Sequence, residues 1–201
     1  MMENKIRYGL EQVHIAFLDE ELTTPEMPVW KEPIHVPGAI GFSSSPQGEE
    51  VRVYADNKAY YVNTTNNGYT GELELVLFPD EIIAEMLGHT IDENGMMVES
   101  PDDKPKPFAL MFQVQGDQRN RRMVYYNCQA SRGGQEHSTR EATITPTTET
   151  ASLIMLPIEV EGKQWTKGVI EYSESNAEVF NSFFDEVKLP SVLTEPEEPE
   201  V

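Results

Sequence analysis

The sequence predicts a mainly β protein, an antiparallel β-sandwich or barrel with one or two short flanking helices. Most segments alternate apolar and polar residues with a period of two, which is typical of strands with one buried face. Residues that favour turns separate these segments at short intervals. Only two segments combine an apolar stripe with the start and stop signals of a helix. We therefore expect the helices to pack outside the sheet.

The alternating segments predict the strands. In one of them, Leu73, Leu75 and Leu77 share a face that we expect to be buried, while Glu72 and Glu74 share the opposite face. The proline-rich passage at 24–37 predicts an extended loop instead. The expected strands lie at residues 13–18, 40–46, 51–54, 60–63, 72–77, 108–114, 124–128, 151–156 and 164–172.

Two segments predict helices. The first starts at Pro79 and Asp80, which suit a first helical turn, and Gly88 is placed to end it. The second starts at Ser175, with Glu178 completing a capping box, and Pro190 follows it. The expected apolar stripes are Ile82, Ile83, Met86 and Leu87 in the first helix, and Val179, Phe180, Phe183, Phe184 and Val187 in the second.

The length of 201 residues suits one domain with a proper core and projecting loops. We expect this domain to span residues 1–190, with a long loop at about 43–69. Residues 191–201 form an acidic tail rich in proline and glutamate that we expect to be disordered. No apolar run approaches the length of a membrane helix, and the N-terminus lacks the apolar centre of a signal peptide. Together with a single cysteine, these features favour synthesis in a reducing cytoplasm.

The formal net charge is −20, from 15 basic and 35 acidic residues. Proteins bind nucleic acid non-specifically through Lys and Arg, which release counterions from the phosphates. So acidic a chain is therefore not expected to bind DNA or RNA in this way.

The sequence predicts no catalytic, cofactor-binding or metal-binding site. Its four histidines are scattered, without the spacing of metal ligands. The segment 92–95 faintly matches a calcium loop, but Met96 and Met97 break the pattern, so an ordinary turn is favoured. Glu72 and Glu74 share a strand face, an arrangement that is compatible with the carboxylates of a retaining glycosidase, but a solvated strand face is the interpretation that we favour. Cys128 is expected to be a buried, inert thiol.

One basic cluster and a set of tyrosines are candidates for contacts with partners. The cluster could contact phosphate or pair with acidic surface on a neighbouring subunit, and the negative net charge favours the second alternative. The tyrosines could stack on bases, but aromatic residues of this kind more often pack in cores and interfaces. The candidates for inter-subunit contacts are Tyr54, Asp56, Tyr60, Tyr61, Tyr69, Arg119, Arg121 and Arg122.

Four blocks of sequence, from about Tyr8 to Pro190, carry a resemblance to a known family. They are GLEQVHIAFLDE, VPGAIGFSSSPQGEEVRVYADNKAYYVNTTNNGYTGELELVLFPDEI, KPKPFALMFQVQGDQRNRRMVYYNCQASR and ITPTTETASLIMLP. The most specific parts are the YADN turn, NNGYxGxLEL and YNCxASR. In their order and spacing, the blocks resemble the major tail proteins of long-tailed bacteriophages of Gram-positive bacteria.

This resemblance implies a structural virion protein without catalytic residues or a cofactor. Its copies would close into hexameric rings, and the rings would stack into the tail tube that conducts DNA into the host. Its partners would be itself and other tail proteins, namely the tape measure, the tail terminator and the distal tail protein, with no membrane involved. DNA would slide through the lumen without specific binding, so an acidic or neutral wall is expected. Glu72 and Glu74 are the candidates for lumen-facing positions.

The sequence leaves two other functions open. One is a β-sandwich module that recognises carbohydrate on a virion, and the other is a glycan-degrading enzyme. A tube protein should form long hollow polymers through its 43–69 excursion, whereas a binding module stays discrete. An enzyme needs carboxylates that converge in a cleft. The tube subunit is the interpretation that we favour.

Overall fold

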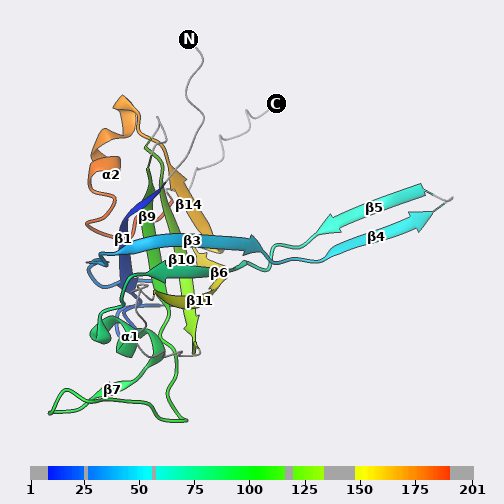
Figure 1. Ribbon diagram of the computed structural model, residues 1–201. Coiled ribbons are helices and arrows are strands. Elements are labelled where there is room, and N and C mark those ends of the chain that lie inside the picture. The colour runs from blue at the N-terminus through cyan, green and yellow to red at the C-terminus, as the bar shows by residue number, and fades with distance from the viewer. Residues whose placement is uncertain (1–8, 25–26, 56–57, 116–119, 134–147, 191–201) are drawn as a thin grey trace, which may run out of the picture.

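The computed structural model describes residues 9–24, 27–55, 58–115, 120–133 and 148–190. Within them, eight strands form one antiparallel sheet in the order β2–β1–β9–β10–β11–β6–β3, with β14 paired to β10 beside this path (Figure 1). This confirms the mainly β, antiparallel fold class. The strands of the sheet are β1 Leu10–Phe17, β2 Ile34–His35, β3 Ala39–Pro46, β6 Tyr69–Leu75, β9 Phe108–Val114, β10 Arg122–Ser131, β11 Glu149–Leu156 and β14 Lys167–Ile170.

Three further strand pairs lie outside this sheet. They are the pairs β4–β5, β7–β8 and β12–β13, each antiparallel. Their bounds are β4 Glu50–Ala55, β5 Lys58–Thr64, β7 Thr90–Ile91, β8 Met97–Val98, β12 Ile158–Val160 and β13 Lys163–Trp165.

The sheet folds over itself, and the main core lies between its two halves. Figure 1 shows β3 and β6 running across β1 and β9 as a second layer. The inner faces of both layers are apolar, so their side chains interdigitate as in other sandwiches. The helix α1, Asp80–Leu87, adds Ile82 and Met86 to this core. Its fully buried members include Phe17, Leu73, Leu75, Leu110 and Met155.

A second apolar cluster covers the other face of β1, β9 and β10. Its members from the sheet are Ala16, Ala109, Met111, Val124 and Tyr126, and the C-terminal segment covers them with Phe183. These strands are therefore buried on both faces. This explains why consecutive residues in them are apolar, where a strand with one buried face would alternate apolar and polar residues. A register shift in β10 between Tyr125 and Cys128 lets Cys128 join the main core, while Val124 and Tyr126 join the second cluster.

The first predicted helix is confirmed and the second is shorter than predicted. Gly88 ends α1 in the left-handed conformation, with φ of 77°. The second consists of a 3₁₀ turn, η1 Glu174–Asn176, followed by α2 Ala177–Asn181. Its capping box is formed by Ser173 and Asn176, not by the predicted pair. The chain leaves helical geometry after Asn181 and follows the sheet, and the Tyr126 hydroxyl donates to the carbonyl of Lys188 at 3.2 Å.

The prediction that Leu77 is buried beside Leu73 and Leu75 is wrong. Strand β6 ends at Leu75, and the side chain of Leu77 is 65% exposed. The period-two spacing of the leucines continues in the sequence, but the backbone leaves the sheet to reach Pro79 and α1. This spacing therefore no longer predicts which side chains are buried. Predictions for 56–57, 116–117 and 191–201 lie outside the described residues, as do the candidates Asp56 and Arg119.

Candidate assembly surfaces

The hairpin formed by β4 and β5 projects from the body of the molecule (Figure 1). It continues the β3–β6 ribbon: at its base the Thr65 amide donates to the carbonyl of Glu49 at 3.0 Å, and the Gln47 amide donates to the carbonyl of Gly68 at 2.8 Å. In the part of the chain that the structure describes, β4 and β5 pair only with each other. An isolated two-stranded hairpin is marginally stable in water. This hairpin therefore offers two unpaired strand edges to a partner.

Three of the predicted inter-subunit residues lie on this hairpin. Tyr54 belongs to β4, and Tyr60 and Tyr61 belong to β5. The register pairs Val53 with Tyr61. The structure therefore places the three tyrosines on the two strands of the projecting element, and their contact with a neighbouring subunit stays a prediction.

Tyr69 lies at the start of β6 and makes contacts within its own chain. Its half-buried ring meets the ring of Tyr125 edge-to-face, with the centroids 5.7 Å apart. The Lys167 ammonium lies 4.5 Å from the centre of the Tyr69 ring, within the range of a cation–π contact. Tyr69 thus stabilises the place where the hairpin joins the body.

The arginines of the basic cluster that the structure describes also contact their own chain. Arg121 pairs with Glu171 at 2.5 Å. The Arg122 guanidinium lies over the rings of Phe180 and Phe184, at 4.0 and 4.8 Å, and donates to the Phe180 carbonyl. These contacts fasten the C-terminal segment to β10. Sequence reasoning missed them because the aromatic partners are about sixty residues away in the chain.

Glu72 and Glu74 lie on the outward face of β6, which serine and threonine side chains and the exposed Ile154 of β11 share. In register with Glu72 are Ser43 on β3 and Ser152 on β11. The Thr148 hydroxyl donates to Glu74 at 2.6 Å. The strands β3, β6 and β11 contain no lysine or arginine. This face can therefore line a passage for a polyanion without binding it electrostatically.

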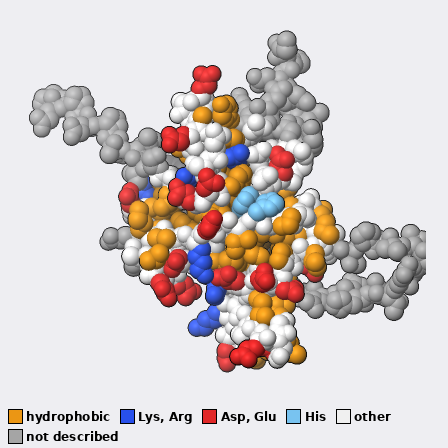
Figure 2. All heavy atoms as spheres, turned by 90° about the vertical axis from the view of Figure 1, so that its left-hand side faces the viewer, with side chains coloured by type: hydrophobic (Ala, Val, Ile, Leu, Met, Phe, Trp, Pro, Cys, Tyr) orange, Lys and Arg blue, Asp and Glu red, His pale blue; other side chains and the backbone are white. Residues whose placement is uncertain are grey.

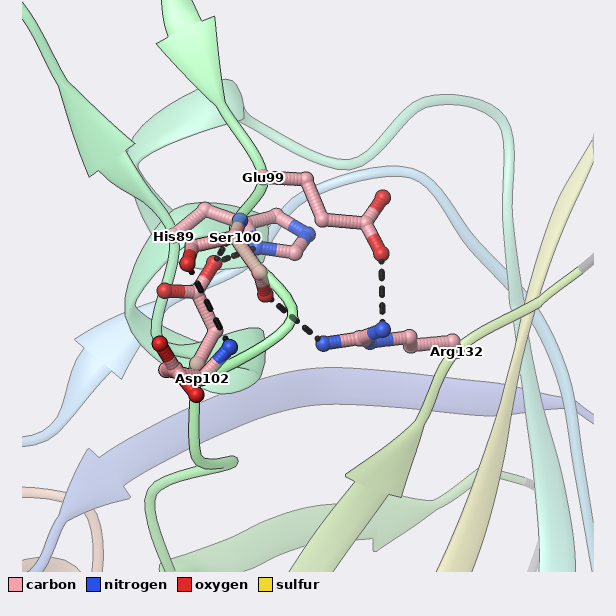
Figure 3. Close-up of polar contacts among 6 residues, drawn as sticks. His89, Glu99, Ser100, Asp102 and Arg132 are labelled. Carbon is pink, nitrogen blue, oxygen red and sulfur yellow. Dashed lines mark hydrogen bonds and ion pairs between the residues drawn. The ribbon is translucent and has the colours of Figure 1, made fainter.

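A hairpin excursion between α1 and β9 carries a polar network that the sequence did not reveal. The imidazole of His89 contacts the carboxylate of Asp103 at 2.9 Å, and the Ser100 amide donates to the same carboxylate at 2.7 Å (Figure 3). Arg132 pairs with Glu99 at 3.0 Å and donates to the Ser100 carbonyl at 3.1 Å. The Ser100 amide, aided by His89, lowers the pKa of Asp103 below its ordinary value. The network anchors residues 88–107 to the body.

The described residues contain no group of three or more His, Cys, Asp or Glu side chains that could hold a metal ion. Within the same residues, no helix is both long and apolar enough to cross a membrane. The Asp92 turn is confirmed: its carboxylate accepts the amides of Asn94 and Met96 at 2.8 Å each, which lowers the pKa of Asp92. Burial of Cys128 is also confirmed, and this burial raises the pKa of its thiol.

The chain matches no family model and no curated protein. Among solved structures it is similar to a chain from the cryo-EM structure of the anti-feeding prophage baseplate, refined with 6-fold symmetry. That chain is 10% identical, with a TM-score of 0.42, and the match covers 85% of this chain and 97% of the other. A likeness of this strength does not assign a function, so the function must be argued from the chain's own surfaces.

Proposed function

We propose that this chain is a structural protein of a phage virion that self-assembles into stacked hexameric rings, which form the tail tube that conducts DNA into the host. The observation that carries this proposal is the β4–β5 hairpin, an element with no partner strand in the described part of its own chain. Such an element gains its stability when another subunit covers it. The sequence resemblance to major tail proteins supports the same conclusion.

The charge distribution of the hairpin favours contact between copies. The whole chain carries a net charge of −20, which opposes association of identical subunits. The segment 50–64 carries two acidic residues, Glu50 and Asp56, and two basic residues, Arg52 and Lys58. Its formal charge is therefore zero, so the hairpin can approach a second copy with little repulsion.

The outward face of β3, β6 and β11 supports the role of a conduit. Its serine, threonine and glutamate side chains offer no cation to a phosphate backbone. A tube lined by this face would let DNA slide. In the virion, the proposed partners are further copies of this chain and the tape measure, tail terminator and distal tail proteins.

Removal of the hairpin tests the proposal directly. Because the Thr65 amide already donates to the carbonyl of Glu49, a two-residue Asn-Gly turn can join Glu49 to Thr65 in place of residues 50–64. We expect the parent protein to form long hollow tubes in electron micrographs. The hairpin-less variant should stay unpolymerised, with an unchanged melting temperature, because β4 and β5 pair only with each other in the described part of the chain.

The outcomes distinguish the alternatives. Normal tubes from the hairpin-less variant would show that assembly uses another surface. A parent protein that stays monomeric at all concentrations would contradict the tube function and favour the carbohydrate-binding module. An enzyme would need converging carboxylates, but Glu72 is exposed on an open strand face and Glu74 is engaged by Thr148.

A further inference from the structure

The β3–β6 ribbon has two different ends. At one end Pro46 is in register with Tyr69, and the chain continues into the projecting hairpin. At the other end Ala39 is in register with Leu75, and the chain continues from β6 toward α1. The two ends of one ribbon therefore face in opposite directions along its axis (Figure 1).

The end away from the hairpin carries an exposed apolar patch, which we call the ribbon-end patch. It consists of Ile40, Val76 and Leu77, whose side chains are 46%, 55% and 65% exposed. Figure 2 views the molecule from this side and shows hydrophobic side chains on the face, interspersed with charged and histidine side chains. Large apolar side chains that gather on one face mark an interaction surface more often than isolated ones do.

The ribbon-end patch is held in place by hydrogen bonds of its own backbone. The Val76 amide donates to the carbonyl of Gly38 at 2.9 Å. The Phe78 amide donates to the carboxylate of Glu149 at 2.8 Å, and the ring of Phe78 is buried in the main core. Leu77 is therefore presented outward by two fixed neighbours. A surface that is already ordered loses little entropy when a partner binds it.

We propose that the ribbon-end patch receives the β4–β5 hairpin of a second copy of this chain. This inference rests on the proposed self-assembly and names the two surfaces that meet. The hairpin sequence supplies apolar and aromatic residues at Val51, Val53, Tyr60, Tyr61 and Val62. Its segment is formally neutral, so its approach to a second copy meets little net repulsion.

The positions of the two surfaces determine the kind of assembly. Since the hairpin and the patch lie at opposite ends of one ribbon, a docked copy still offers its own free hairpin or free patch. Such a contact is heterologous and repeats from copy to copy, until a rotation closes a ring or an open polymer forms. A contact of hairpin with hairpin would instead be isologous and would stop at a dimer.

Two variants, each lacking one of the two surfaces, test the contact. Leu77→Asp introduces a charge into the patch while leaving the core intact, because Leu77 is mostly exposed. The hairpin-less variant lacks the other surface. We expect each variant alone to be monomeric by analytical ultracentrifugation, and an equimolar mixture of the two to form a one-to-one complex. As a matched control, Val169→Asp on β14 replaces a side chain that is 50% exposed, and this variant should polymerise like the parent.

Cross-linking provides a second measurement that does not depend on loss of assembly. A Val53→Cys variant mixed with a Leu77→Cys variant should give disulfide-linked pairs that contain one chain of each kind. Cys128 does not compete, because it is fully buried. Three outcomes would overturn the inference without contradicting the tube function. They are tubes formed by the Leu77→Asp variant, a dimer formed by that variant alone, and the absence of a one-to-one complex in the mixture. A monomeric parent would overturn both.

Discussion

At the residue scale, His14 shows how the C-terminal segment is held against the sheet. Gln12 has a positive φ of 56° and lies in a register shift of β1, and its carbonyl accepts a hydrogen bond from Nδ1 of His14 at 2.9 Å. This orients the imidazole so that it stacks on the ring of Phe184, with centroids 4.5 Å apart. The Arg122 guanidinium also lies over the ring of Phe184, and the ring of His35 is 4.9 Å from that of His14.

This environment makes the stability of the fold depend on pH. Burial lowers the pKa of His14 below its ordinary value of 6.5, and the nearby His35 and Arg122 lower it further. The folded protein therefore holds the neutral imidazole, whereas the unfolded chain takes up a proton near the ordinary value. The stabilisation is fully present above that value and is lost as the pH falls below it.

We predict that the melting temperature falls as the pH is lowered from about 7.5 to about 5.5, the range in which histidine titrates. His14→Phe keeps an aromatic ring against Phe184 but cannot take up a proton, so its melting temperature should fall less over the same range. Differential scanning calorimetry of the two proteins checks this. Equal slopes for parent and variant would show that other groups control the pH dependence.

At the element scale, the excursion at 88–107 depends on one glycine. Gly88 has a φ of 77°, and a Cβ atom built on it would lie 2.3 Å from the carbonyl oxygen of Lys104. A side chain at this position would therefore strain the backbone and also push away the segment around Lys104 that leads back to β9. His89, the next residue, contacts Asp103 and so joins the two ends of the excursion.

We predict that Gly88→Ala destabilises the protein by more than about 1 kcal/mol, because the native φ is unfavourable for alanine. Chemical denaturation measures this loss. Gly95→Ala is the matched control, since Gly95 also has a positive φ but has open space around it. Gly95→Ala should cost less than Gly88→Ala, and equal losses would show that the close approach to Lys104 is unimportant.

The elements also show what the sequence can and cannot predict. Period-two alternation predicted the strands around Phe17, Leu73 and Leu110, because each strand has a face in the main core. The same alternation failed at Leu77, where the backbone leaves the sheet. The predicted stripe of the second helix was correct only in part: Phe180 and Phe183 are buried, but Val179 is 46% exposed, and the helix ends at Asn181. Contacts with a distant sheet, which no local pattern encodes, decided the backbone there.

The candidate surfaces were predictable to different extents. The excursion at 43–69 was visible as an aromatic, turn-rich segment longer than a small sandwich needs, and the structure shows its strands as a projecting hairpin. The ribbon-end patch was not visible, because Leu77 continues the buried face of Leu73 and Leu75 in the sequence, and Val76 lies on the opposite face with Glu72 and Glu74. The intrachain contacts of Arg122 were hidden for a related reason: the sequence gives a residue's charge but not its distant aromatic partners.

At the scale of the whole molecule, the distribution of charge matters more than its total. The outward face of β3, β6 and β11 carries Glu72 and Glu74 among serine and threonine side chains and the exposed Ile154, and these three strands contain no basic residue. In a narrow tube, DNA and wall lie within about one Debye length, roughly 8 Å at physiological salt, so wall charge is only partly screened. The sign of the charge on this face should therefore control whether DNA slides or is held.

We predict that tubes of the double variant Glu72→Lys with Glu74→Lys retain short double-stranded DNA, while tubes of the parent do not. Each lysine is repeated in every subunit, and neutralised phosphates release counterions, so retention should weaken steeply as salt rises from about 0.05 M to about 0.5 M. DNA held in the lumen is protected from nuclease, which separates it from DNA on the outer surface. The matched control is Glu159→Lys with Glu178→Lys, which reverses the same number of charges at exposed positions on β12 and α2. Protected DNA in the control tubes as well, or unprotected DNA on the double variant, would show that the β3–β6–β11 face does not line the channel.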